Sequence, residues 1–120
     1  LYQSFVEPGD LLELVLVFRV EHQYQMEVAV TRVADRNPAL MIELSLKSEV
    51  AATEQLDPRW KALFLRHPDR FMVGTDTWVT SQWDRFTEIQ TSVRGWLGQL
   101  PRDIAEKIAY RNARKFIGLP

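Results

Sequence analysis

The stretch "HPDRFMVGTDTW", residues 67–78, decides the fold prediction, because an apolar run ends there at a single carboxylate. The apolar residues 71–73 are followed by Gly-Thr and then directly by Asp76. A proline before the run and threonines after it mark its two ends. The pattern predicts a short buried strand over residues 70–74 that carries an acid at its carboxyl end.

Two apolar segments upstream predict further strands. Residues 11–20, "LLELVLVFRV", and residues 39–46, "ALMIELSL", are almost continuously apolar, as expected for strands that are covered on both faces. Between the strands, residues 23–37 and a shorter segment that begins at Pro58 carry apolar side chains at helical spacing. The order of elements is therefore strand, helix, strand, helix, strand.

The predicted helices have clear ends. Asn37-Pro38 ends the first helix, since the residue before a proline is disfavoured in the helical region. Asp57 is placed as the N-cap of the second helix, with Pro58 as its first residue. Its inner face is expected to carry the apolar residues Trp60, Leu63 and Phe64.

Two helices are expected after the third strand. The first covers residues 82–97, and the second begins near Pro101 and ends at Gly118. The residues at helical spacing that should face the core are Trp83, Phe86, Ile89 or Gln90, Val93, Trp96 and Leu97 in the first, and Ile104, Ala105, Ile108 and Ala109 in the second.

This order predicts an α/β fold with a parallel sheet, in which ligands bind at the carboxyl ends of the strands. His22 follows the first strand and Asp76 follows the third, so both are candidate site residues. Trp78, in the loop after Asp76, either lines a substrate pocket or packs over the strand end. The alternative role of Asp76 is to cap the next segment, and that of His22 is an ordinary polar residue at a strand end.

Composition bounds the function. The 120 residues carry a net charge of −1, which gives no footprint for nucleic acid or an anionic membrane, and contain no cysteine. The apolar residues 11–20 are too few for a membrane helix, so a cytoplasmic location is expected; a small-molecule substrate is expected only through the family resemblance given below. Three parallel strands make a poor independent sheet with two open edges, so we expect a single partial domain over residues 1–120, forming a homo-oligomer or associating through those edges.

The chain resembles the carboxyl-terminal part of the amidohydrolase-related family, metal-dependent hydrolases and decarboxylases built on a (β/α)8 barrel. The resemblance is carried by "PDRFMVGTDTW" at residues 68–78 and by "KIAYRNARKF" at residues 107–116, with its Asn-Ala pair Asn112-Ala113. "NPALMIELS", residues 37–45, resembles the seventh-strand region of the family. The resemblance implies that this chain spans about strands six to eight of an incomplete TIM barrel.

The family also implies roles for individual residues. Asp76 matches the aspartate after the eighth strand, which binds the metal or takes the proton from metal-bound water. His22 matches the sixth-strand histidine ligand, although the glycines usual around it are replaced by "VEHQYQ". The implied cofactor is a divalent metal, with zinc expected, held in the intact parent and not necessarily by this chain. The first-strand His-x-His pair and the fifth-strand ligand have no counterpart here.

Three functions follow as alternatives. The chain belongs to a hydrolase that cleaves C–N or C–O bonds with metal-activated water, the segment alone being inactive. Alternatively, within the same family, the parent is a metal-dependent decarboxylase. A third interpretation is a truncated or degenerate module without catalysis, which associates with another chain.

Overall fold

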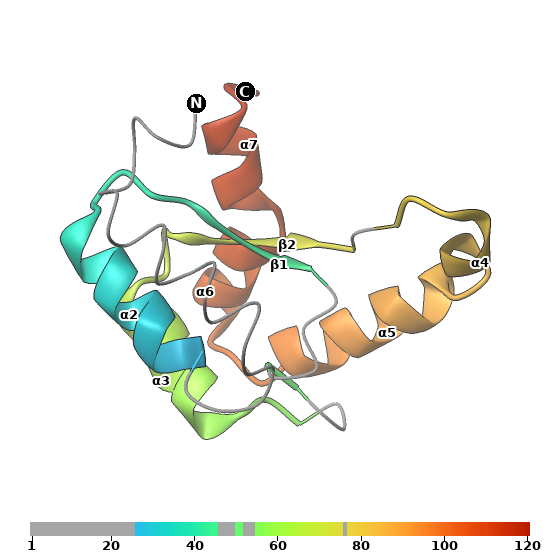
Figure 1. Cartoon of the computed structure of the whole chain (residues 1–120), viewed down its shortest axis with the longest axis horizontal. Helices are drawn as coiled ribbons and strands as arrows, with labels where there is room; N and C mark the ends of the chain where they lie inside the picture. The colour runs from blue at the N-terminus through green and yellow to red at the C-terminus, as the bar shows by residue number, and fades with distance from the viewer. Residues whose placement is uncertain (1–25, 46–49, 52–54, 76) are drawn as a thin grey trace. The chain divides into compact units, whose positions relative to one another are not determined.

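A computed structural model describes residues 26–45, 50–51, 55–75 and 77–120 of the chain (Figure 1). The chain divides into two compact units, Leu1–Leu40 and Met41–Pro120. The elements of the second unit, in chain order, are β1 (Ile42–Ser45), α3 (Pro58–Arg66), β2 (Phe71–Gly74), α4 (Thr80–Trp83), α5 (Phe86–Leu97), α6 (Arg102–Glu106), the π-helix η2 (Lys107–Arg111) and α7 (Asn112–Phe116).

The described part of the first unit is the helix α2, Met26–Arg36, which confirms the helix predicted over residues 23–37. Asn37 ends it as expected, and its backbone N–H and its side-chain Nδ2 both donate to the carbonyl of Val33, at 3.0 and 2.9 Å. The predicted strand over residues 11–20 lies outside the described residues.

β1 and β2 form a two-stranded parallel sheet, as the strand-helix-strand order predicted. Ile42 is paired with Phe71 and Ser45 with Gly74, and the Ile42 N–H donates to the Arg70 carbonyl at 2.8 Å. Because the strands are parallel, their carboxyl ends lie at the same edge of the sheet. The second unit is therefore a mixed α/β structure.

The helix α3 connects the two strands and begins where the sequence predicted. Asp57 accepts a hydrogen bond from the backbone N–H of Arg59 at 2.8 Å, and Pro58 occupies the first turn, where it has no N–H to leave unsatisfied. The helix ends at His67, whose backbone N–H donates to the carbonyl of Leu63 at 2.9 Å. The predicted inner face is confirmed, since Trp60, Leu63 and Phe64 are all buried.

The core of the second unit is built around Phe64. Its ring lies 4.9 Å from that of Phe71 on β2, edge-on, and 5.7 Å from that of Trp96 on α5, nearly stacked. Trp60 lies one turn earlier on α3, with its ring centroid at 5.9 Å. Three elements distant in sequence thus meet at one aromatic side chain, and packing of this kind stabilises beyond the area that it buries.

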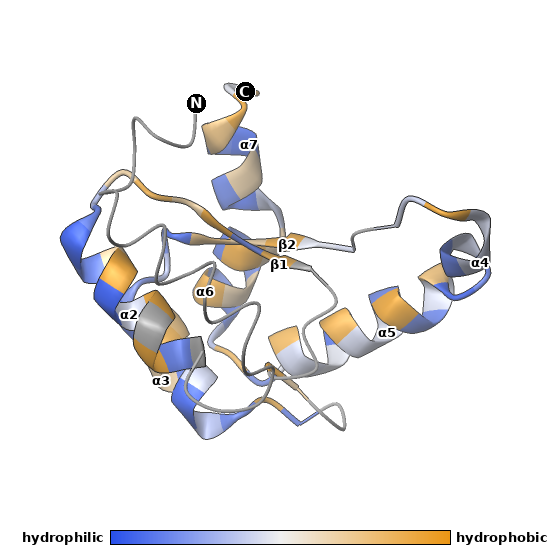
Figure 2. Ribbon diagram, in the orientation of Figure 1, coloured by the Kyte–Doolittle hydropathy of each residue, from blue (hydrophilic) through white to orange (hydrophobic). Residues whose placement is uncertain are grey.

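The helix predicted over residues 82–97 is confirmed as α5 over residues 86–97, whereas its predicted start is wrong, because the chain breaks at residues 84–85 and residues 80–83 form the separate helix α4. The side chain of Gln82 accepts hydrogen bonds from the backbone N–H groups of Trp78 and Val79, which closes α4 as a short local turn. Of the predicted inner face, only Trp96 and Leu97 are buried, and Trp83 is exposed. In Figure 2, α5 extends away from β1 and β2, and apolar positions continue along its ribbon toward that far end.

The last predicted helix contains a π-helical turn, η2, between α6 and α7. Ile108 on η2 is fully buried as expected, whereas Ala109 is exposed and its predicted inward position is wrong. Gly118 ends the helix with a φ of 74°, a left-handed conformation that favours glycine. The Leu119 N–H donates to the backbone carbonyl of Arg114 at 2.8 Å, and the Gly118 N–H donates to the backbone carbonyl of Lys115 at 3.2 Å. These two hydrogen bonds form the Schellman pattern.

Over the residues placed in the structure, no helix combines the length and the apolar character that a membrane crossing requires.

Candidate functional site at the ends of the second strand

The carboxyl end of β2 leads into the segment that the sequence predicts as a site. Thr75 follows Gly74 and is half-buried, and the hydroxyl of Thr77 donates to the hydroxyl of Thr75 at 3.0 Å. Asp76 stands between these threonines in sequence and lies outside the described residues. The two threonines that flank the predicted catalytic acid in sequence are therefore joined by a side-chain hydrogen bond.

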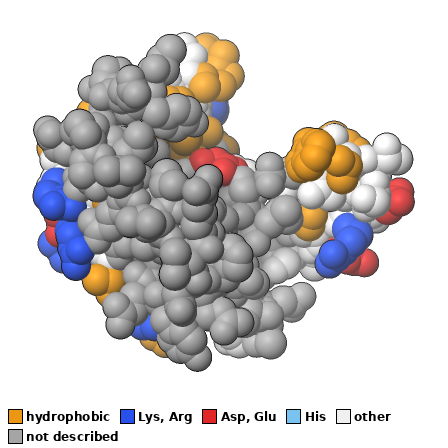
Figure 3. Space-filling model, in the orientation of Figure 1, with side chains coloured by type: hydrophobic (Ala, Val, Ile, Leu, Met, Phe, Trp, Pro, Cys, Tyr) orange, Lys and Arg blue, Asp and Glu red, His pale blue; other side chains and the backbone are white. Residues whose placement is uncertain are grey.

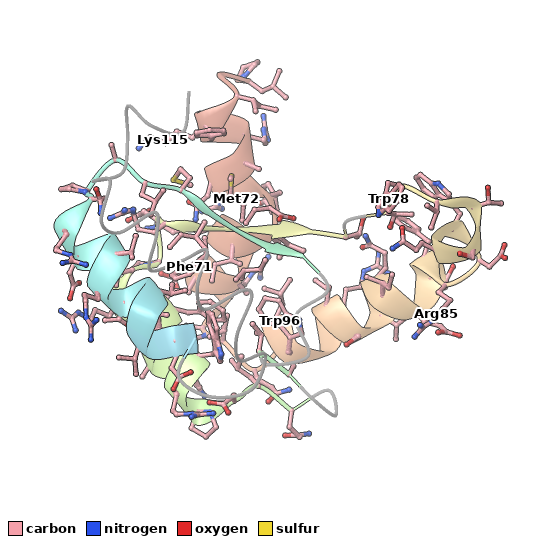
Figure 4. All side chains as sticks on the ribbon, in the orientation of Figure 1. Phe71, Met72, Trp78, Arg85, Trp96 and Lys115 are labelled. Atoms are coloured by element: carbon pink, nitrogen blue, oxygen red, sulfur yellow. The ribbon has the colours of Figure 1, made fainter. Side chains whose placement is uncertain are left out.

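Trp78 lies in the loop after this segment, and its indole is 76% exposed. In Figure 4 it lies with Arg85 on the segment that projects away from β1 and β2. The interpretation that Trp78 packs over the strand end is therefore wrong. Its role in substrate binding stays a prediction, since an exposed indole is free to contact a ligand.

The second predicted metal ligand, His22, also lies outside the described residues. His67 ends α3 at the amino side of β2. Across the part of the chain that the structure describes, no group of three His, Cys, Asp or Glu side chains comes close enough to hold a metal ion. The described donors alone do not make a metal site.

The best-defined polar arrangement lies at the amino end of β2. The side-chain Nδ2 of Asn112, which is buried, donates to the carbonyl of Pro68 at 2.8 Å and to that of Phe71 at 2.9 Å. The Lys107 ammonium pairs with Asp69 in the same turn, with Nζ and Oδ1 2.9 Å apart. The carboxyl-terminal helix therefore fixes the turn that starts β2.

Sequence reasoning identified Asn112 only as part of a motif and missed this structural role. A signal was present, because Asn112 follows Ile104 and Ile108 at intervals of four residues and so falls on the apolar face of the helix. A polar amide on a buried face needs hydrogen-bond partners. Nothing in the sequence shows that the partners are two carbonyls forty residues away.

A second charged cluster lies on the carboxyl-terminal helix. Glu106 accepts hydrogen bonds from Arg102, at 3.0 Å, and from Arg111. The hydrogen bond from Arg102, followed by the charge of Arg111, holds the pKa of Glu106 below its ordinary value. The Arg111 guanidinium also lies 6.0 Å from the centroid of the Tyr110 ring. The two arginines are exposed and share the half-buried Glu106, so these ion pairs support the helix and form no catalytic arrangement.

A search of family models, curated proteins and solved structures finds no match to this chain. The resemblance to the amidohydrolase-related family therefore rests on the residues quoted in the sequence analysis. The parallel sheet and the buried Asn112 are the observations that any proposal must accommodate.

Proposed function

We propose that the chain is the carboxyl-terminal part, about strands six to eight, of an amidohydrolase-like (β/α)8 barrel that hydrolyses C–N or C–O bonds with metal-activated water. The observation that carries the proposal is the parallel pairing of β1 and β2, with β2 leading straight to Asp76. In parallel barrels the catalytic residues come from the carboxyl ends of the strands. Asp76 follows such an end by two residues.

The contact made by Asn112 adds support. The two sequence stretches that carry the resemblance, residues 68–78 and 107–116, are far apart in the chain and meet where Asn112 binds the carbonyls of Pro68 and Phe71. A shared structural reason for both stretches favours a common origin in one fold. It favours the fold more than the chemistry, since Asn112 contacts the amino end of β2, whereas Asp76 follows the carboxyl end of β2 in sequence.

The chemistry assigned to this chain is the transfer of a proton. The carboxylate of Asp76 accepts a proton from the attacking water and returns it to the leaving group, which is general acid–base catalysis. A divalent metal, when bound, lowers the pKa of water so that hydroxide is available near neutral pH. His22 is the second proposed ligand, and Trp78 the proposed substrate contact. A zinc site needs about three protein ligands, and no three donors among the described residues come together to supply them.

The proposal is tested on the gene product that contains this segment, with and without added zinc. Esterase, lactonase and amidase substrates are assayed for the natural protein, for Asp76→Asn and for the matched control Asp103→Asn. Asp103 is exposed on α6 and remote from β2 in sequence, so its variant should keep its activity. Loss of activity in Asp76→Asn alone is the expected result, and equal activity in all three proteins removes Asp76 from the mechanism.

The same proteins and assays distinguish the proposed hydrolase from two alternative functions. A decarboxylase would release carbon dioxide from a carboxylic acid substrate and leave the hydrolase substrates unchanged. A non-catalytic module would show neither reaction and would associate with another chain, an interpretation that the exposed Trp78 and Trp83 favour. A protein that is monomeric, binds one zinc ion per chain and turns over a substrate excludes the module.

A further inference from the structure

Two apolar surfaces are exposed on the second unit. The first, which we name the aromatic arm, consists of Trp78 and Trp83, which are 76% and 58% exposed, together with the half-buried Phe86. The second, the carboxyl-terminal tip, consists of the exposed side chains Phe116, Ile117 and Leu119. Exposed apolar side chains are common singly, but grouped ones mark contact surfaces.

The aromatic arm is an ordered surface. The rings of Trp83 and Phe86 lie 5.4 Å apart at an interplanar angle of 35°. Gln82 holds the backbone of Trp78 through a hydrogen bond of 2.9 Å. Residues 78–88 contain two acids, Asp84 and Glu88, and one base, Arg85, so the arm has a net charge of −1.

The carboxyl-terminal tip is also ordered, and its charge is opposite. Its chain direction is set by the Schellman hydrogen bonds from Leu119 to Arg114 and from Gly118 to Lys115. Residues 110–119 contain three bases, Arg111, Arg114 and Lys115, and no acid, which gives +3. Glu106 compensates Arg111, so a net positive charge remains beside the apolar side chains.

We propose that the carboxyl-terminal tip of one copy of the chain docks on the aromatic arm of a second copy. The surfaces are complementary in charge, and the cations Arg114 and Lys115 suit the faces of two exposed indoles. Figures 3 and 4 show the arm and α7, which carries Lys115, on separate parts of the molecule. Contact between the two surfaces therefore joins different copies.

The geometry of such a contact is heterologous, because each copy uses two different surfaces. One arm and one tip stay free in every assembly that does not close into a ring, so copies add to one another in a chain. This distinguishes the proposal from a two-fold dimer, in which the same surface would meet itself. It also stands apart from the proposed hydrolase, since its test requires neither substrate nor metal.

The exposed areas predict that the association is weak. With roughly 200–250 Å² for a whole aromatic side chain, the two indoles leave about 300 Å² uncovered, and the tip offers a similar area. A stable interface buries roughly 800 Å² on each partner. The contact is thus less than half of that size. We therefore expect a weak complex that forms at chain concentrations between about 10 µM and about 1 mM and exchanges rapidly.

Sedimentation of the full chain over that concentration range gives the first test. The mean mass should rise with concentration, and added salt should reduce it, since part of the attraction is between exposed charges. The fluorescence of the indoles should shift to shorter wavelength as they lose water. A chain that stays monomeric throughout the range overturns the proposal.

Complementation between two variants tests the heterologous geometry. One variant loses the arm, Trp78→Ser with Trp83→Ser, and the other loses the tip, Phe116→Ser with Ile117→Ser. Circular dichroism confirms that both remain folded, which is expected because all four side chains are exposed. Each variant alone should be monomeric, whereas an equimolar mixture should form a dimer of one copy of each and nothing larger.

The other outcomes each contradict the proposal. Association of the tip variant alone would show that the arm binds itself. Association of both variants alone would assign the contact to another surface, such as an edge of the β1–β2 sheet. A mixture that stays monomeric would show that the arm does not bind the tip of a second copy, and that any partner of the arm is a different molecule.

Discussion

Two pairs of aromatic residues in this protein have nearly the same local arrangement and opposite surroundings. Trp60 and Phe64 on α3 have ring centroids 5.9 Å apart and are buried, whereas Trp83 at the end of α4 and Phe86 at the start of α5 have ring centroids 5.4 Å apart and Trp83 is exposed. The difference comes from Phe71 and Trp96, which cover Phe64 from β2 and α5. Helical spacing thus identifies an apolar face, and residues far away in sequence decide whether that face is covered.

Replacing Phe64 by alanine should give the largest loss of stability. The side chain is fully buried and contacts three aromatic rings, so the free energy of unfolding should fall by about 3–5 kcal/mol. The matched change Phe86→Ala removes a ring of the same size from a half-buried position in the aromatic arm and should cost less, about 1 kcal/mol. Urea unfolding followed by circular dichroism measures both.

Phe64→Ala could unfold the protein entirely, because a small domain is only about 5–15 kcal/mol stable. Phe64→Leu then replaces it, with a smaller loss in the same direction. Equal losses in Phe64 and Phe86 variants would break the comparison, since they would show that the arm is covered in solution within one chain.

Asn112→Ala should give the second largest effect. The change leaves the carbonyls of Pro68 and Phe71 without their donor in a buried place, which should cost about 2–3 kcal/mol. Asn112→Asp keeps the shape but turns an acceptor toward two acceptors, so at neutral pH it should destabilise more than alanine does. Thermal or urea unfolding of the three proteins at one pH gives the ranking.

The pH dependence of Asn112→Asp is its own control. Below about pH 4 the introduced carboxyl becomes protonated and can donate to one of the carbonyls, so its stability should approach that of Asn112→Ala. An aspartate variant as stable as the natural protein at neutral pH would show that the two hydrogen bonds contribute little.

Much of the packed region could be predicted from the sequence. The turn chemistry at Asp57-Pro58 and the ends at Asn37-Pro38 and Gly118 are local, so they are encoded within a few residues and the structure confirms them. The parallel pairing of β1 and β2 also followed from the order of the elements. These features depend on backbone chemistry or on topology.

The errors have a common physical cause. Trp83 and Ala109 were assigned to the core from their spacing, and the break at residues 84–85 was missed, because none of these depends on the local pattern alone. The partners of Asn112 were missed for the same reason. The candidate site could be predicted only as a position after β2 and through a resemblance, because its chemistry depends on side chains brought together from several strands.

Asp57→Ala tests the local contribution to the packed region, with an effect of about 1 kcal/mol expected for a lost N-cap. The hydrogen bond from the Arg59 side chain holds the pKa of Asp57 below its ordinary value. Stability from the ionised carboxylate is therefore present above the pKa of the unfolded chain, about 3.9, and is lost as pH falls through the lower folded value. The difference in the free energy of unfolding between the natural protein and Asp57→Ala should therefore become smaller below about pH 4.

The counterpart in the arm is Gln82→Ala, which removes the acceptor for Trp78 and Val79. It should leave the unfolding midpoint almost unchanged, because α4 contributes no buried side chain to the core. Hydrogen exchange at the two amides should accelerate instead. A midpoint that falls as far as in Asp57→Ala would mean that the arm and the packed region unfold as one cooperative unit.

Gly118→Ala should have the smallest effect on global stability, because its cost is confined to the last turn of the chain. At a φ of 74° an added Cβ meets nothing within 4 Å, so the cost is that of the left-handed backbone alone, about 1 kcal/mol. Since only the last turn depends on it, exchange at the Leu119 amide should accelerate while global unfolding is unchanged. Gly98→Ala is the matched control, because the φ of −63° at Gly98 suits alanine. A Cβ added there would lie 3.4 Å from the carbonyl oxygen of Arg94. Loss of association in Gly118→Ala without loss of fold would tie the ordered tip to the proposed contact with the aromatic arm.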